Sequence, residues 1–284
     1  MNRTSKIRVL ANALAVSLSG HRIGKKIAYL HIPKCGGTSL HYSIASKYGL
    51  SALLTPNNII HLNSVASAFA AQRMGKSIGE FRDEIVGYYF AHPAAKFISG
   101  HFHFDSSSCK LLSEGWSFIT LLRDPVPRFV SAFYYNKYLP DFPSPYHLQK
   151  SSPAAKDGDF YIQRLTGSLE EFVYMDEALK YGCDMVRQIA SCDANGFGVT
   201  DAEINNAINF LEGFEVVGLL EHMDDFVADF YGKFGVKLAI PHLNFANKKS
   251  VKLDQLPVQV VDRIREICEP NIKVYEHFKN KIAR

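Results

Sequence analysis

The segment whose residue types best suit chemistry is YLHIPKCGGTSL, residues 29–40. It overlaps a predicted buried strand, residues 26–32, and leads into a predicted helix, residues 38–48. Glycines allow a tight turn and a close approach to a ligand. A helix N-terminus adds unpaired N–H groups and a positive dipole end. The sequence therefore predicts an anion-binding loop, formed by Pro33, Lys34, Cys35, Gly36, Gly37, Thr38 and Ser39.

This loop does not follow the GxxxxGK[ST] pattern of nucleoside triphosphatases, in which the lysine comes after the last glycine. Here Lys34 precedes the glycine pair, and the loop is shorter. The simpler alternative is a structural strand–turn–helix with a Gly-Gly turn. The order of proline, lysine, glycines and hydroxyl residues favours anion binding over that alternative.

A second candidate anion site lies in FITLLRDPVPRFVSAFYY, residues 118–135. A predicted strand, residues 117–122, ends at Arg123, and Asp124 and Pro125 suit the start of a helix. We expect Arg123 and Ser131 to meet at one anion, since arginine is a forked donor suited to phosphate. The alternative is a capped helix with a solvent-facing arginine. In the predicted helix, residues 125–138, the side chains expected to face the core are Val126, Phe129, Val130 and Phe133, and those expected on the other face are Arg128, Ser131, Tyr135 and Tyr138.

Two histidines follow a further predicted strand, residues 97–101, in the segment SGHFHF. An imidazole titrates near neutral pH and can accept a proton there. In an extended segment His101 and His103 would share one face. We rank His101 first and His103 second as a general base, with a structural histidine as the alternative, and Lys34 as the stabiliser of developing negative charge.

The string HIPKCGGTSL resembles the 5′-phosphosulfate loop of sulfotransferases that use 3′-phosphoadenosine-5′-phosphosulfate (PAPS). It is closest to the branch of the heparan sulfate 2-O-sulfotransferases, where HIPKTGGTS is usual and Cys35 stands for threonine. Arg123 and Ser131 match the spacing of the family's 3′-phosphate motif, and Gly100–His101 resembles its Gly-His element, where histidine is the base. The resemblance implies a P-loop-like parallel sheet, PAPS as sulfuryl donor, no metal, and a hydroxyl acceptor, by resemblance a carbohydrate.

Later parts of the chain resemble the family more weakly. Glu221 follows a predicted strand, residues 215–220, and would orient a base or cap the next helix. The polar stretch HLNFANKKS, residues 242–250, would close over the nucleotide through Lys248, and a solvated run of charges is the alternative. Two other functions stay open: an ATP-using kinase-like enzyme, and a nucleotide-binding or glycan-binding relative without catalysis.

Short apolar strands separated by helices predict an α/β fold with a mainly parallel sheet flanked by helices. The helices expected in the later half are residues 223–234, 256–268 and 271–282. We expect one domain over residues 1–284, with a proline-rich loop at residues 139–160 on the substrate side.

Composition places the chain among ordinary globular proteins, with 284 residues, 47% hydrophobic content and net charge +4. The mild basic excess fits an anionic ligand and lacks the clustering typical of nucleic-acid binders. Five cysteines without a CxxC pair favour a reducing, cytoplasmic compartment. Cys183 and Cys192 are near enough in sequence to bridge, but buried thiols are the expectation. The oligomeric state is open.

Residues 1–24 form a predicted N-terminal helical extension. Three basic residues precede a short apolar run that resembles the front of a signal peptide but has no well-placed cleavage site and is too short to span a bilayer. Apolar residues recur in it at helical spacing and predict an amphipathic helix. We expect this helix to pack on the domain, with contact to a membrane surface as the alternative. The apolar residues are Ile7, Leu10, Leu14 and Leu18.

Overall fold

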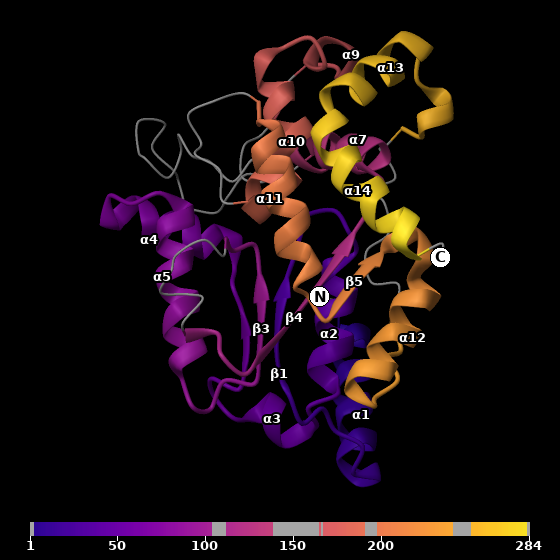
Figure 1. The fold of residues 1–284 in the computed structure, drawn as a ribbon. Coiled ribbons are helices and arrows are strands. Elements are labelled where there is room, and N and C mark those ends of the chain that lie inside the picture. The colour runs from indigo at the N-terminus through magenta and orange to yellow at the C-terminus, as the bar shows by residue number, and fades with distance from the viewer. Residues whose placement is uncertain are drawn as a thin grey trace.

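The computed structural model describes residues 3–103, 112–138, 165, 167–190, 198–240 and 251–282, without the side chains of residues 3–6 and 8. The described residues form an α/β fold around one five-stranded parallel sheet, as predicted (Figure 1). The strand order is β2-β3-β1-β4-β5. The strands are β1 (Lys26–Leu30), β2 (Ile59–His61), β3 (Phe97–Gly100), β4 (Trp116–Leu122) and β5 (Val216–Leu219).

Helices flank both faces of the sheet and cover its upper end in Figure 1. Short 3₁₀ turns, η2 (Leu220–His222) and η3 (Leu253–Gln255), precede α12 and α13. The helices are α1 (Arg3–Ser19), α2 (Gly37–Ser46), α3 (Leu50–Leu54), α4 (Ser64–Met74), α5 (Ile78–Ala91), α7 (Pro125–Lys137), α9 (Leu169–Phe172), α10 (Asp176–Ala190), α11 (Asp201–Glu212), α12 (Met223–Phe234), α13 (Val258–Ile267) and α14 (Glu269–Ile282).

Strand β1 shows why the sheet needs helices on both sides. Successive side chains of a strand point to opposite faces. Ala28 and Leu30 belong to a core cluster shared with α5, α10, α11 and α14. Ile27 and Tyr29 belong to a second cluster shared with α2, α3 and α12. A strand that is apolar on both faces is typical of a parallel sheet covered on both sides.

The strand order places the central strand at a switch point. From β1 the chain builds β2 and β3 on one side, then crosses to build β4 and β5 on the other. Leu30, the last residue of β1, pairs with Gly100 of β3 and with Thr120 of β4. In open parallel sheets, ligands bind beyond the carboxyl ends of the strands at such a point. The segments after β1, β3 and β4 therefore meet at the edge where this fold class forms sites.

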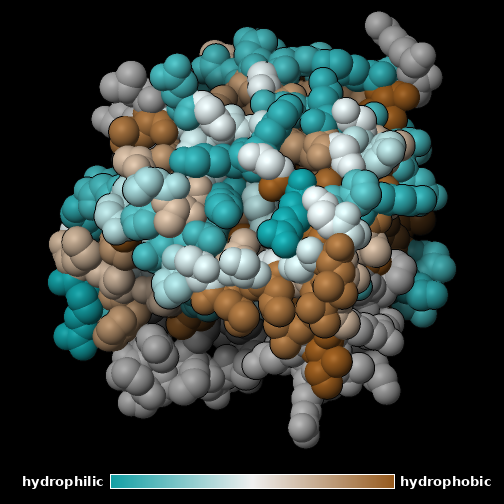
Figure 2. All heavy atoms as spheres, turned by 90° about the horizontal axis from the view of Figure 1, so that it is seen from below, coloured by the Kyte–Doolittle hydropathy of each residue, from teal (hydrophilic) through white to brown (hydrophobic). Residues whose placement is uncertain are grey.

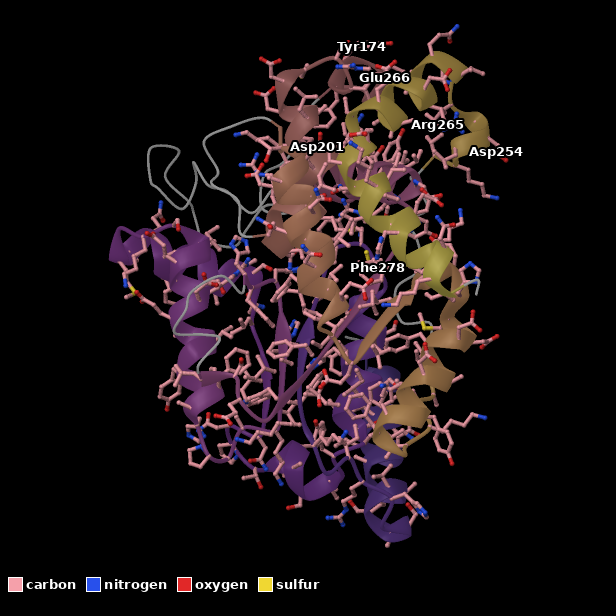
Figure 3. All side chains as sticks on the ribbon, viewed as in Figure 1. Tyr174, Asp201, Asp254, Arg265, Glu266 and Phe278 are labelled. Atoms are coloured by element: carbon pink, nitrogen blue, oxygen red, sulfur yellow. The ribbon has the colours of Figure 1, made fainter. Side chains whose placement is uncertain are left out.

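Beyond that edge, α7, α9, α10 and α13 share a third core cluster. Helix α14 joins this upper layer to the sheet. Phe278 of α14 is buried in the first core cluster, and Lys273 forms a 3.0 Å ion pair with Asp201 at the start of α11 (Figure 3). The layer that covers the carboxyl edge is thus connected to the elements that carry the strands.

Most of the predicted elements are confirmed within two residues at either end. The strand β2 and the helices α3, α4, α5, α9, α10 and α11 were not predicted from the sequence. In the part of the chain that the structure describes, no helix is long and apolar enough to cross a membrane.

The N-terminal helix packs on the domain, as expected, but through a different face from the one that the sequence suggested. Helix α1 contacts α2 and α3, whereas its large apolar side chains lie at the surface: Leu14 is 48% exposed and Leu18 is 81% exposed. Ala13 and Val16 provide the buried face instead. Small residues allow the helix to approach its neighbours closely, so the larger residues at helical spacing are directed outward.

Candidate anion-binding site

The turn between β1 and α2 has the backbone of a ligand-binding loop. Gly36 has φ of +76° and Lys34 has φ of +66°. A left-handed conformation is uncommon for a residue with a side chain and tends to cluster at functional sites. At Gly37, a Cβ atom would lie 1.8 Å from Nε2 of His31, so any larger residue would force the ring or the loop to move. The backbone conformation at Gly36 and the space at Gly37 therefore both favour glycine.

Helix α2 begins at Gly37, directed so that its N-terminus lies at the carboxyl edge of β1. Its N-cap residue is Gly36, which has no side chain to cap the first N–H groups. The Ser39 N–H donates to the Gly36 carbonyl oxygen at 3.1 Å, so the first turn is tight. Thr38 is half-buried and Ser39 is buried. A helix start without a side-chain cap can hold an anion.

Cys35 contributes to this loop through its backbone alone. The thiol is buried in the core, and Sγ lies 3.6 Å from the Pro33 carbonyl oxygen. Burial raises the pKa of this thiol to about 12, so it stays neutral near pH 7. A threonine hydroxyl in the same place would also face the core. Substitution by cysteine therefore leaves the outer surface of the loop unchanged.

Arg123 joins the two predicted motifs. Its Nη1 donates to the Lys34 carbonyl oxygen at 3.0 Å. Helix α7 starts directly after it, with the Asp124 carboxylate accepting from the Val126 N–H at 3.0 Å and Pro125 in the first turn, as predicted. Because β4 lies beside β1, the end of one strand places Arg123 against the loop that follows the other.

Lys34 is held close to this arginine and to an aromatic ring. Its Nζ lies 4.0 Å from the centre of the Tyr135 ring, within cation–π range. Burial and then the charge of Arg123 lower the pKa of Lys34 to about 8. Ser131 is half-buried and precedes Tyr135 by one turn of α7, on the helix face that meets Lys34. Lys34, Arg123 and that face of α7 are thus brought together.

Arg128 corrects the predicted division of α7 into two faces. We expected it beside Ser131 and Tyr135, but its side chain is 1% exposed. Its guanidinium forms a two-pronged ion pair with Asp184 of α10 and donates to the Pro33 carbonyl oxygen at 3.4 Å. Asn271 of α14 donates to the same carboxylate at 3.2 Å. Arg128 therefore supports the loop from inside the protein.

The sequence analysis missed this support on α10. Asp184 and Gln188 are one helical turn apart, and the Gln188 Nε2 donates to the His31 carbonyl oxygen at 3.1 Å. Polar residues four apart among the apolar Met185, Val186 and Ile189 were the available signal. A polar pair on a buried helix face needs partners, and here those partners are the loop and α7.

His101 lies at the same edge, in an arrangement that fixes its tautomer. Its Nδ1 is 2.7 Å from the His31 carbonyl oxygen, and the two rings stack at 4.5 Å. A carbonyl only accepts, so Nδ1 carries the proton and Nε2 is the basic nitrogen. Burial, followed by the effect of His101, holds the pKa of His31 well below its usual value, so His31 stays neutral.

His103 is held by a different element. Its Nδ1 would lie 3.1 Å from a Cβ atom at Gly79, so the ring packs against the first turn of α5. His101 instead contacts the segment after β1. The hydrogen bond of His101 to the His31 carbonyl connects it with the segment that leads into the loop of Lys34. The ranking of His101 before His103 as a general base stays a prediction.

Glu221 neither caps α12 nor contacts a histidine in the interactions that the structure gives. Its carboxylate accepts from the Asp124 N–H and from the Tyr275 hydroxyl, each at 3.1 Å. The N-cap of α12 is His222. Glu221 therefore connects the end of β5 with helix α14 and with the start of α7. Arg123 lies directly before that start.

Several predicted residues lie outside the described ranges. These include Lys248 with the rest of residues 241–250, the loop at residues 139–160, and Cys192. Cys35, Cys183 and Cys268 are buried. Within the described residues, no group of three or more His, Cys, Asp or Glu side chains is arranged to hold a metal ion.

The described site can therefore bind an anion at the start of α2, with Lys34, Arg123 and the His101 imidazole at the same edge of the sheet. Comparison of the chain with models of known protein families gives no match, and comparison with curated proteins gives none either.

Proposed function

We propose that this chain is a PAPS-dependent O-sulfotransferase that acts on a hydroxyl group, by resemblance that of a carbohydrate. The observation that carries the proposal is the 3.0 Å hydrogen bond from Arg123 Nη1 to the Lys34 carbonyl oxygen. It joins two predicted phosphate-binding motifs that are far apart in sequence. A nucleotide with a phosphate at each end of its ribose needs both motifs within the reach of one ligand.

The charges of the described residues fit such a ligand. Burial and then the nearby charge of Arg123 lower the pKa of Lys34. A bound anion would offset this repulsion and add charge-assisted hydrogen bonds. The N–H groups at the start of α2 would contribute further donors without any reorganisation of the loop.

When bound, PAPS supplies an activated sulfuryl group and a nucleotide phosphate as leaving group. Lys34 would neutralise charge that develops on the bridging oxygen. Nε2 of His101 would accept the proton of the acceptor hydroxyl, since Nδ1 is committed to the His31 carbonyl. Arg123 and Ser131 would hold the 3′-phosphate and so fix the donor for in-line transfer.

The carbohydrate acceptor rests on the resemblance of HIPKCGGTSL to one branch of the family. A cytoplasmic location is part of the same proposal and rests on the sparse cysteines. Cys35 and Cys268 are buried, and burial raises the pKa of both thiols, as expected for structural thiols.

A transfer assay with ³⁵S-labelled PAPS and a panel of glycan, lipid-linked sugar and phenolic acceptors tests the proposal. We expect labelled product without added Mg²⁺, and no transfer by a Lys34→Ala variant whose circular dichroism matches the wild type. Transfer of phosphate from ATP that requires Mg²⁺ would indicate a kinase-like enzyme instead. Binding of the product nucleotide without transfer to any acceptor would indicate a relative without catalysis.

A further inference from the structure

The outer face of α1 exposes large apolar side chains in a single stripe. Ile7 is 59% exposed and Leu10 is 46% exposed, in line with Leu14 and Leu18 further along the helix. These four residues, which we call the α1 stripe, recur at intervals of three and four and so share one side of the helix. Figure 2 looks at the lower end of the molecule, where α1 and α3 lie in Figure 1, and brown apolar atoms gather over part of that face.

The orientation of α1 is fixed, so the stripe is directed outward by the fold. Ser17 accepts a hydrogen bond from the Leu50 N–H of α3 at 2.8 Å and donates to the Ala13 carbonyl oxygen at 2.9 Å. Ala13 and Val16 are buried on the same side. Rotating the helix to bury the leucines would break these contacts, so the stripe is a surface feature of the folded chain.

The charge of the N-terminal part of the sequence is strongly one-sided. Residues 1–79 contain ten Lys and Arg and no Asp or Glu, whereas the remaining residues contain 22 Lys and Arg and 28 Asp and Glu, a net charge of −6. Basic residues stand at both ends of α1 in the sequence. They are Arg3, Lys6 and Arg8 at its start and Arg22 and Lys25 after its end. Arg22 and Lys25 are exposed, and Arg22 donates to the Ser17 carbonyl oxygen at 3.1 Å.

We propose that α1 lies in the interface of an anionic phospholipid bilayer, with the α1 stripe inserted among the acyl chains and the flanking basic residues on the headgroups. An apolar stripe bounded by Lys and Arg is typical of helices that lie in the membrane surface. Lipid phosphates complement the basic segment. The proposal is independent of the proposed sulfotransferase activity.

A second copy of the chain fits the stripe less well. Pairing of two α1 stripes in a symmetric dimer would bring two identical basic segments together, and like charges across an interface are unfavourable. A polyanion such as nucleic acid would satisfy the charges but leave the leucines in water. An anionic surface with an apolar interior matches both parts of this face.

Vesicle flotation tests the proposal with the full chain. We expect the protein to float with vesicles of 70% phosphatidylcholine and 30% phosphatidylglycerol, less with phosphatidylcholine alone, and less at high salt. Leu14→Ser/Leu18→Ser should lower the partition coefficient by roughly tenfold or more, because two buried leucine side chains are lost. Val258→Ser, at a residue of α13 that is 70% exposed, is the matched control and should float like the wild type.

A second variant tests the basic residues at the start of α1. Lys6→Gln/Arg8→Gln should lower partition to the anionic vesicles only, whereas Arg265→Gln on α13 should not. The absence of flotation by the wild type, or equal flotation of wild type and Leu14→Ser/Leu18→Ser, would overturn the proposal. So would light scattering that shows a dimer which the leucine variant converts to a monomer, since the stripe would then be an interface between copies.

Discussion

The Nη1 atom of Arg123 donates a hydrogen bond to the carbonyl oxygen of Lys34, 89 residues earlier in the chain. Each residue follows a strand of the same parallel sheet, and those strands, β1 and β4, are neighbours. The contact therefore follows from the strand order. It places a fixed guanidinium beside a lysine whose backbone is left-handed, at the start of an uncapped helix.

Removal of the Arg123 guanidinium should weaken the binding of a nucleotide that carries a 3′-phosphate. We expect Arg123→Gln to cost about 1.5–3 kcal/mol in the affinity for 3′-phosphoadenosine-5′-phosphate, the range for a hydrogen bond to a charged group. Isothermal titration calorimetry measures this difference. The exposed Arg265 offers a control, and an equal loss in Arg265→Gln would mean that general charge rather than position matters.

The lowered pKa of Lys34 predicts a pH dependence of binding. The ammonium loses its proton as pH rises through about 8, so affinity for the bisphosphate should be level near pH 7 and fall between pH 8 and 9.5. Nucleotide phosphates are already fully ionised over that range, since their second pKa is about 6. Lys34→Met should bind more weakly at pH 7 and lack the decline. If Lys34→Met showed the same decline in affinity, the pH dependence would belong to another group.

The role of His101 can be separated from that of a structural residue by kinetics. Loss of a general base lowers turnover by about 10²–10⁴-fold. We expect His101→Ala to show such a loss with little change in the dissociation constant for PAPS, and His103→Ala to show a smaller one. The exposed His222 is a control. Equal losses of turnover and PAPS affinity in His101→Ala would point to a structural role.

The close approach of His31 to Gly37 predicts a severe cost for a single methyl group. Gly37→Ala should lower the free energy of unfolding by about 2 kcal/mol or more, because an interior contact of 1.8 Å forces the ring or the loop to move. Gly232 of α12 has nothing within 4 Å of its Cβ position, so Gly232→Ala should be neutral or slightly stabilising. Urea unfolding compares the two, and equal effects would contradict the packing described.

The ion pair of Arg128 with Asp184 gives a further stability prediction. Arg128→Met leaves a buried carboxylate without its partner, which costs about 3–5 kcal/mol. Arg128→Met/Asp184→Leu should recover much of that loss, since the uncompensated charge is gone. Urea unfolding of the single and double variants measures the coupling. A double variant as unstable as the sum of both single variants would show that the pair is not coupled.

The sequence predicted those parts of the molecule whose signals are local. Apolar runs identified β1, β3, β4 and β5, and the Asp124–Pro125 pair marked the start of α7. The strand β2 is three residues long and has no such run, so it is defined by pairing with β3. Helices α10 and α11 were not predicted, although apolar residues recur at helical spacing in both, such as Ile204, Ala207 and Leu211 in α11.

Burial that depends on tertiary contacts could not be read in the same way. By its spacing in the sequence, Arg128 resembles a surface residue of an amphipathic helix. It is buried because it forms an ion pair with Asp184 of α10. The leucines of α1 resemble a core-facing stripe, yet close packing of Ala13 turns them outward. In both cases helical spacing identified which residues share a side, but the neighbouring elements decided which side is buried.

One titration tests the central claim that the loop after β1 and Arg123 bind the two ends of a single nucleotide. Adenosine 5′-monophosphate and 3′-phosphoadenosine-5′-phosphate are titrated into the wild type and into Arg123→Gln. We expect the wild type to favour the bisphosphate by tenfold or more, in line with about 1.5–3 kcal/mol, and the variant to lose that preference while keeping its affinity for the monophosphate. Equal affinity of the wild type for both nucleotides would contradict the account.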